Sequence, residues 1–167
     1  MRSIRWAWLG PAAFLVHDGE EVLVFAPWLR RHAHELPSVV RPLLDALGTR
    51  PLAAAVAVLL AAYVVATALG VRALRQGRRP WPYLLVTGAF VGNGITHVLQ
   101  VLAFGSYTPG VVTAVLVSLP YGWCAARALH RDGVASRRLL ATLLLVGVAL
   151  QVPIAWLALQ AGRQLAP

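Results

Sequence analysis

The stretch WAWLGPAAFLVHDGEEVLVFAPWL, residues 6–29, carries the segment HDGEE, residues 17–21, in the middle of an apolar run. An ionisable side chain at bilayer depth costs on the order of 3 kcal/mol on insertion scales. Such side chains therefore face a protein interior and usually perform a task there. The stretch predicts a functional polar site buried inside a membrane protein.

The rest of the chain supports a membrane protein. Of its 167 residues, 59% are hydrophobic and 13% are charged, far from the composition of a typical soluble domain. Five apolar runs, each close to the ~20 residues that cross the hydrocarbon core, lie near residues 4–27, 52–71, 81–104, 109–129 and 139–159. Lipid cannot satisfy free backbone groups and the runs lack strand alternation, so α-helices are expected. We predict an all-α bundle of five transmembrane helices in one domain, residues 1–167, with an outer loop over residues 28–50.

A cleavable signal peptide is the alternative for the first run, because Arg2 and Arg5 precede it. A signal peptide has a short uncharged apolar segment that ends in a small-residue cleavage motif. Here three carboxylates interrupt the run and no such motif closes it. We therefore expect the first helix to be retained.

The basic residues predict the orientation. All 15 are arginines, and in a five-helix bundle they divide unequally between the two sides. The side of the N-terminus receives Arg2, Arg5, Arg72, Arg75, Arg78, Arg79, Arg127, Arg131, Arg137 and Arg138, and the other side receives Arg30, Arg31, Arg41, Arg50 and Arg163. The positive-inside rule then places the N-terminus in the cytoplasm and the C-terminus outside, in a multi-pass protein of the cytoplasmic membrane. The net charge of +9 is explained by these anchors, and no basic patch with interleaved aromatic residues indicates nucleic-acid binding.

The polar segment has the spacing of a metal site. On a helix, Glu20 and Glu21 follow His17 by three and four residues, so both carboxylates flank the imidazole on one face, while Asp18 points away. A His-x-x-Glu pair is the reverse of the Glu-x-x-His spacing that helical bundles project inward to hold two iron or manganese ions. One copy needs further ligands from elsewhere in the bundle.

The third run offers those ligands. Asn93 and His97 are four residues apart and share a helix face. At 1.5 Å per residue, Glu21 lies roughly 24 Å from Arg5 and His97 roughly 27 Å from Arg79, which puts both polar groups at a similar depth in the outer half. We expect His17, Glu20, Glu21, Asn93 and His97 to converge on one site, because intramembrane ionisable groups usually pair with one another.

These residues also carry a family resemblance. The segments His17-Asp18-Gly19-Glu20-Glu21, Asn93-Gly94-Ile95-Thr96-His97 and Tyr107-Thr108-Pro109-Gly110-Val111-Val112-Thr113 together resemble the HXXEE family of small bacterial membrane proteins. The resemblance covers most of the chain. It implies a multi-helix protein of a bacterial membrane whose biochemical function is not established, and so it supports a site without assigning a reaction.

The side chains favour a metal-dependent enzyme, a hydrolase or an oxidoreductase, that acts on a small lipophilic substrate within the membrane lipid. Imidazole and carboxylate ligands suit Zn²⁺, Fe²⁺ or Mn²⁺. In this interpretation His17, Glu21 and His97 bind the metal, Glu20 is a bridging ligand or a general base, and Asn93 orients water. The candidate catalytic residues are thus Glu20, Glu21 and Asn93, and the candidate ligands are His17, Glu20, Glu21 and His97.

Three other interpretations stay open. A buried glutamic acid with a His-Glu partner can protonate an alkene and recover the proton, which gives metal-free isomerisation or cyclisation of a sterol-like or terpenoid-like substrate. Transport or proton relay is less favoured, because the inner half shows few polar partners beyond Thr67, Thr87 and Ser118. A structural polar knot that fixes helix register needs no substrate at all.

Secondary candidates lie in the loops and in the last run. His32 and His34 belong to the outer loop, and Tyr107 and Thr113 flank the short loop that leads to the outer end of the fourth helix. Within the outer loop, residues 39–47 are expected to form a short interfacial helix. In the last run, Gln151 and Pro153 predict a kink whose freed carbonyl the amide satisfies. The sequence does not fix the oligomeric state.

Overall fold

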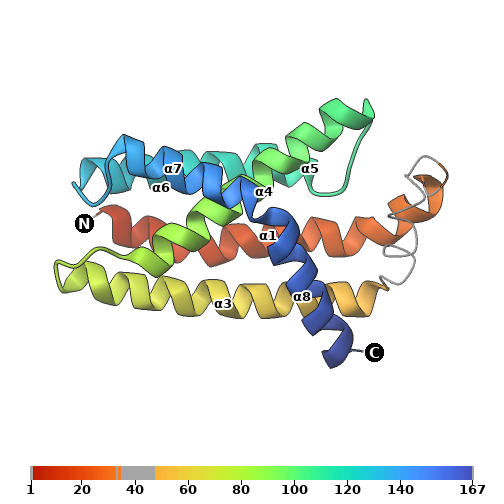
Figure 1. Ribbon diagram of the computed structural model, residues 1–167, viewed down its shortest axis with the longest axis horizontal. Helices are drawn as coiled ribbons and strands as arrows, with labels where there is room; N and C mark the ends of the chain where they lie inside the picture. The colour runs from red at the N-terminus through yellow and green to blue at the C-terminus, as the bar shows by residue number, and fades with distance from the viewer. Residues whose placement is uncertain (1, 33, 35–47, 167) are drawn as a thin grey trace.

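A computed structural model describes residues 2–32, 34 and 48–166, and every element in these ranges is helical (Figure 1). The expectation of an all-α fold is confirmed for them. The predicted short helix over residues 39–47 lies outside the described residues. The elements are α1 (Arg2–His32), α3 (Thr49–Arg75), α4 (Trp81–Phe104), α5 (Val111–Thr113), a π-helix (Ala114–Ser118), α6 (Leu119–Arg131), α7 (Arg137–Ala149) and α8 (Gln151–Leu165).

Several of these helices are long and apolar enough to cross a membrane. They are α3, α4 and the continuous stretch Val111–Arg131, which joins α5, the π-helix and α6, and the bent pair α7 and α8 adds one more if it counts as a single span. Helix α1 is long enough but does not qualify by composition, because the charged segment 17–21 interrupts its apolar stretch. The described chain therefore has three or four such spans, where the sequence predicts five.

The last predicted span is not one straight helix. Helix α7 ends at Ala149 and α8 begins at Gln151, with a bend of 53° between them. Pro153 lacks the backbone N–H that would continue the helical ladder across this break. The side chain of Gln151 donates from Nε2 to the carbonyl oxygen of Gly147 at 2.9 Å and to that of Ala89 in α4 at 2.7 Å. The kink predicted at this position is thus present, and the amide satisfies carbonyl groups there.

Glycines let the helices approach closely. A Cβ atom on Gly92 of α4 would lie 2.6 Å from the backbone nitrogen of Val148, and one on Gly88 would lie 2.8 Å from the carbonyl oxygen of Leu143. Because lipid tails are as apolar as leucine, helices in a bilayer associate mainly through close packing of small residues. The pairing of α4 with α7 follows this rule.

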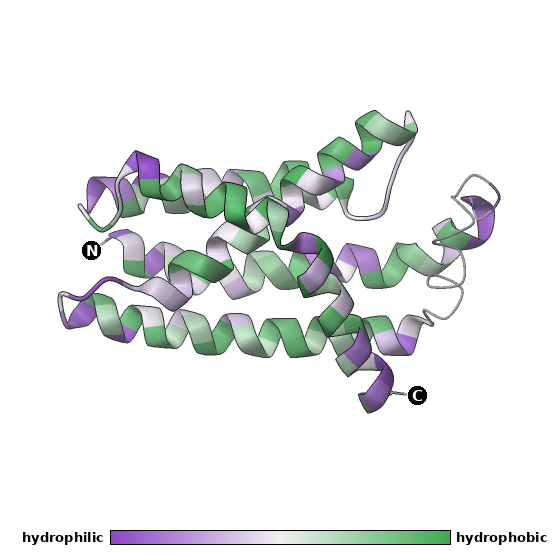
Figure 2. Ribbon diagram, in the orientation of Figure 1, coloured by the Kyte–Doolittle hydropathy of each residue, from purple (hydrophilic) through white to green (hydrophobic). Residues whose placement is uncertain are grey.

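The two chain ends lie at opposite ends of the bundle. The N-terminus of α1 lies beside the turn between α6 and α7 (Figure 1), where both the backbone N–H and the hydroxyl of Ser3 donate to Asp132 at 2.9 and 2.8 Å. Near the other end of the chain, Gly162 of α8 packs against Pro51 and Ala55 at the start of α3. Hydrophilic residues gather towards both ends and hydrophobic ones cover the middle (Figure 2).

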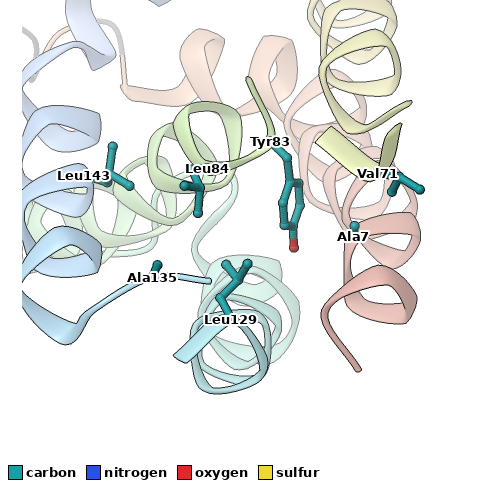
Figure 3. Packing of buried hydrophobic residues seen from close by; sticks show 7 residues of the cluster. All are labelled: Ala7, Val71, Tyr83, Leu84, Leu129, Ala135 and Leu143. Carbon is teal, nitrogen blue, oxygen red and sulfur yellow. The ribbon is translucent and has the colours of Figure 1, made fainter. Parts of the chain in front are cut away.

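Two buried clusters fill the interior. The first lies towards the N-terminal end of α1, where Tyr83 of α4 is surrounded by Ala7, Val71, Leu84 and Leu129 (Figure 3). The second occupies the middle of the bundle and is formed by Phe14, Val56, Tyr63, Phe90, Tyr121 and Ala125. The next turn of α1 after Phe14 brings His17 into the interior, so the polar segment begins where the aromatic core ends.

Candidate metal site

Two helices bring together three side chains of types that can bind a metal ion. Helix α1 supplies His17 and Glu21, and α4 supplies His97. One ligand atom from each residue lies within 4.8 Å of the other two. Oε1 of Glu21 is 2.6 Å from Nε2 of His97 and 4.0 Å from Nε2 of His17, and the two imidazole rings meet edge to face with centroids 5.0 Å apart. The convergence expected from helix spacing and depth is thus found for these three residues.

The cluster is buried away from solvent. The side chain of His17 is fully buried, that of His97 is nearly so, and 21% of the Glu21 side chain is exposed. Although Oε1 of Glu21 lies close to Nε2 of His97, no N–H is aligned with the oxygen, so both buried atoms lack a hydrogen-bond partner. Buried polar atoms are normally hydrogen-bonded, and each exception calls for an explanation such as a missing ion.

Hydrogen bonds fix the tautomer of His17. The hydroxyl of Thr113 donates to Oε2 of Glu20 at 2.6 Å, which uses its single proton, and it therefore accepts from Nδ1 of His17 at 2.9 Å. With the proton on Nδ1, the lone pair of the ring lies on Nε2, the atom that faces Glu21. Histidine ligands in metal sites are oriented in the same way, through a hydrogen bond from the other ring nitrogen.

Glu20 is held away from the three converging atoms. Its Oε2 also accepts the backbone N–H of Thr113 at 2.8 Å, and its Oε1 accepts the hydroxyl of Tyr107 at 2.7 Å. The phenol lies in the loop between α4 and α5, where burial, followed by the neighbouring Glu20 carboxylate, raises the pKa of Tyr107 to about 12 and keeps it a proton donor. The structure thus places Glu20 beside His17 through Thr113, and not at the point where His17, Glu21 and His97 meet.

Asn93 lies at the edge of the cluster. With the His17 proton on Nδ1, Nδ2 of Asn93 donates a hydrogen bond to the Nε2 lone pair of His17 at 3.2 Å. Asp18, which the helix spacing turns away from the shared face, is nevertheless 5% exposed, and its Oδ2 has no hydrogen-bond partner. The spacing argument did not predict this burial of Asp18.

Gly110, in the loop between α4 and α5, packs directly against the cluster. Gly110 has a φ of +88°, in the left-handed region that glycine enters without strain. A Cβ atom there would lie 2.7 Å from Cε1 of His97 and 3.0 Å from Oε1 of Glu21. The segment after it forms α5 and the π-helix, and extra-residue turns of this kind are frequent at functional sites. Tyr107 and Gly110 in the loop and Thr113 at the end of α5 therefore complete the site that α1 and α4 begin.

The other secondary candidates lie outside the cluster. The ring of His32 stacks on Trp28 with centroids 4.9 Å apart, and the indole of Trp28 donates to the carbonyl oxygen of Tyr107 at 2.8 Å. His34 is exposed. Thus Trp28 ties the end of α1 to the site loop, while neither histidine belongs to the three-residue group.

The half of the bundle near the N-terminus of α1 holds more polar groups than the sequence indicated. The hydroxyl groups of Tyr63, Tyr83 and Tyr121 come from three helices and meet in the interior, with Tyr121 at 3.4 Å from Tyr63 and 3.2 Å from Tyr83. Sequence reasoning read these tyrosines as parts of apolar runs, because the faces on which three helices meet cannot be read from one helix at a time. The rings of Phe14 and Phe90 pack between this group and His17, so the two polar regions are separated by an aromatic layer.

Comparison with known proteins places the chain in a family. Residues 8–125 match the family model described as protein of unknown function with HXXEE motif, and the chain therefore belongs to the HXXEE family. The resemblance seen in the sequence is thereby confirmed. A search of curated proteins and a search of solved structures find no match.

Proposed function

We propose that this HXXEE protein binds one divalent metal ion, Zn²⁺, Fe²⁺ or Mn²⁺, between His17, Glu21 and His97. The ion serves the hydrolysis or oxidation of a lipophilic substrate within the membrane. One observation carries the proposal: two imidazole nitrogens and a carboxylate oxygen from two helices lie within 4.8 Å of one another in a buried position. Two imidazoles with one carboxylate is a ligand set that catalytic metal sites use, with further positions left for water or substrate.

The distances fit an ion after small side-chain shifts. Ligand atoms about 2.1 Å from a tetrahedral ion lie about 3.4 Å from each other. The observed separations of 2.6 Å and 4.0 Å from Glu21 Oε1 lie on either side of this value, each within about 1 Å of it. The ligand nitrogens of the third pair, His17 and His97, lie within 4.8 Å of each other, at most about 1.4 Å more than this value. The ion also provides the missing partner for Glu21 Oε1 and His97 Nε2.

The residues around the three ligands then orient a ligand or a bound water molecule. Thr113 and Glu20 hold the Nδ1 proton of His17, so that its Nε2 lone pair stays directed at the ion. The ion takes the place of the Asn93 amide at His17 Nε2, and the released amide then orients a water molecule or a polar group of the substrate. When bound, the metal polarises its ligand water or a substrate oxygen. Glu20 acts here by orienting His17, which replaces the bridging role that the sequence left open.

The membrane arrangement that accompanies this function has five crossings, with the N-terminus in the cytoplasm. The five crossings are supported by the two chain ends, which lie at opposite ends of the bundle. The orientation is supported by the arginines, because ten lie on the N-terminal side and five on the other. In this arrangement His97 lies seven residues before Phe104, where α4 ends, and so about 10 Å below the outer ends of the helices. This depth is accessible to lipophilic molecules from the outer leaflet.

The direct test is the metal content of the full chain, purified in detergent and measured by elemental analysis. We expect about one ion per chain in the wild type and in His130→Ala, a control that removes a histidine far from the cluster. His17→Ala, Glu21→Ala and His97→Ala should each lower the content at least tenfold while the helical circular dichroism is retained. A folded wild-type protein that takes up none of the three metals from excess solution would overturn the proposal. Carboxylate-dependent isomerisation of a lipophilic alkene by such a metal-free protein would establish acid–base chemistry instead.

A further inference from the structure

An arginine patch lies at the turn between α3 and α4, at the end of the bundle that also holds the N-terminus (Figure 1). It is formed by the exposed residues Arg72, Arg75, Arg78 and Arg79. Within the described residues none of the four forms an ion pair, and Asp132 is the one carboxylate at this end. Asp132 accepts the backbone N–H and the hydroxyl of Ser3 at 2.9 and 2.8 Å. The positive charge of the arginine patch is therefore left for a partner outside this part of the chain.

The backbone of the turn is fixed by hydrogen bonds. Gly77 has a φ of +68°, and the N–H of Arg78 donates to the carbonyl oxygen of Ala73 at 2.9 Å, the bond that closes a helix in the Schellman motif. The guanidinium of Arg79 lies over the ring of Trp81, 5.4 Å from its centroid, in a favourable cation–π contact. The turn thus presents its charges in a defined arrangement.

Exposed apolar side chains begin directly beside the arginine patch. On α4, Trp81 and Leu85 are four residues apart on one face and are 46% and 50% exposed. On α3, Val65 and Leu69 are 58% and 50% exposed and share a face that leads to Arg72. Tryptophan is enriched at the level of the lipid headgroups, and exposed apolar residues of a spanning helix contact hydrocarbon. The order along both helices is therefore charge at the headgroup level and apolar surface at the level of the acyl chains.

A phospholipid with a net negative charge matches this order. Guanidinium groups bind phosphate oxygens through paired hydrogen bonds, and the adjacent apolar surface suits an acyl chain. A zwitterionic phospholipid adds a cationic group that the arginines repel. A nucleic acid or an acidic protein would satisfy the arginines but would leave the apolar surface beside them without a partner.

We propose that the arginine patch binds the phosphate group of an anionic phospholipid in the leaflet on the N-terminal side, with an acyl chain along Trp81 and Leu85. The site lies at the opposite end of the bundle from the loop that carries Gly110 (Figure 1) and does not depend on the metal. It gives the protein a specific lipid partner in addition to the bilayer that surrounds it.

The test counts lipids bound to the full chain in dodecyl maltoside by native mass spectrometry. Phosphatidylglycerol should bind at least fivefold more tightly than phosphatidylcholine with the same acyl chains, and added salt should weaken its binding, because salt screens exposed charges. Glycerophosphoglycerol, the same headgroup without chains, should not displace the lipid. Equal affinity for the two lipids would overturn the proposal, and displacement by the free headgroup would replace the lipid with a soluble phosphate ligand.

Two double variants with the same loss of charge locate the site. A basic residue near an anionic surface contributes a factor of about five to affinity, so Arg78→Gln with Arg79→Gln should weaken phosphatidylglycerol binding about 25-fold. Arg30→Gln with Arg31→Gln removes two exposed arginines from the other end of α1 and should stay within about threefold of the wild type. An equal loss in both variants would show that total charge, and not the arginine patch, attracts the lipid.

A polar substitution on the apolar face tests the place of the acyl chain. Leu85→Gln should weaken phosphatidylglycerol binding at least threefold, because the chain then meets an amide. Leu145→Gln, at a position on α7 that is 71% exposed, should leave the affinity unchanged. Circular dichroism verifies that all variants retain their helices. Unchanged affinity in Leu85→Gln, or binding of a DNA duplex with the same dependence on Arg78 and Arg79, would overturn the assignment to a lipid.

Discussion

At the scale of single residues, the chemistry of the site depends on Thr113. Its one hydroxyl proton goes to Glu20, which leaves the oxygen to accept from His17. A hydroxyl at this position therefore decides which nitrogen of His17 carries the lone pair. Residues that orient a ligand in this way typically contribute a factor of about 10 to 100 to metal affinity.

Replacing Thr113 tests this role. In Thr113→Val the side chain keeps its shape but can neither donate to Glu20 nor accept from His17, so we expect the affinity for Zn²⁺ to fall by about 10- to 100-fold. Thr113→Ser retains the hydroxyl and should stay within about threefold of the wild type. Competition with a chromogenic chelator gives both affinities. Equal affinities for the valine and serine variants would show that the Glu20–Thr113–His17 chain has no influence on the metal.

Gly110 permits a matched comparison with a second glycine. Gly110→Ala would place a methyl group 2.7 Å from His97 at a φ of +88°, so both the metal content and the melting temperature should fall. Gly105 has a φ of +67°, and a methyl group added there would meet no atom within 4 Å, so Gly105→Ala carries the backbone strain of about 1–2 kcal/mol alone. We expect Gly105→Ala to lower the melting temperature and to retain the metal. Loss of metal in both variants would show that loop strain, and not the contact with His97, controls the site.

The sequence predicted which residues form the cluster, but it did not predict the hydrogen bonds that orient them. His17, Glu21 and His97 could be placed together because helix spacing gives their face and residue counting gives their depth. The role of Glu20 was open, because the position of Thr113 depends on a loop and a π-helix that a regular 3.6-residue period does not describe. The three converging tyrosine hydroxyls were missed for a related reason, since their meeting depends on how α3, α4 and α6 rotate against one another.

At the scale of helices, the break between α7 and α8 is stabilised by one amide. Gln151→Leu removes two hydrogen bonds to carbonyl groups in an apolar region, which we expect to destabilise the fold by about 1–3 kcal/mol. Gln164→Leu, at an exposed position on the same helix, serves as the control. Thermal unfolding in detergent, followed by circular dichroism, measures the difference. Similar melting temperatures for the two variants would mean that other groups satisfy these carbonyl groups.

The attachment of α1 to the turn between α6 and α7 responds to pH. The backbone N–H of Ser3 donates to Asp132, and this bond holds the pKa of the carboxyl below its usual 3.8. A lowered folded-state pKa means that the stabilisation is present above pH 3.8 and is lost as the pH falls through the folded-state value. Because Asp132 lies at the surface and is partly exposed, we expect an effect below about 1 kcal/mol. Asp132→Asn should remove this part of the acid dependence of unfolding, and an unchanged dependence would contradict the role of the bond.

The sequence predicted helices well where a run was uninterrupted. The third run, residues 81–104, coincides with α4, and the second run lies within α3. The fourth run, residues 109–129, overlaps the stretch Val111–Arg131, which begins two residues later. The fifth run differs, because hydropathy measures whether a segment prefers lipid and does not detect a bend of 53° inside it. The bend was instead predicted from Gln151 and Pro153.

At the scale of the whole molecule, the arginine distribution predicts which end faces the cytoplasm. In a Cys124→Ala background, Gln76→Cys reports on the turn after α3 and Ser106→Cys on the loop after α4, and both positions are exposed. We expect a membrane-impermeant maleimide to label Ser106→Cys in intact cells and Gln76→Cys only after the membrane is opened. The reverse pattern would invert the orientation, and labelling of both in intact cells would exclude a membrane crossing by α4.

The account as a whole depends on a metal ion held by two imidazoles and a carboxylate within a helical bundle. X-ray absorption at the zinc edge of the Zn²⁺-loaded full chain measures this most directly. We predict nitrogen and oxygen neighbours at about 2.0–2.1 Å with the outer scattering of two imidazole rings, reduced to one ring in His97→Ala. A spectrum with oxygen neighbours alone, without imidazole scattering in the wild type, would contradict the proposed site.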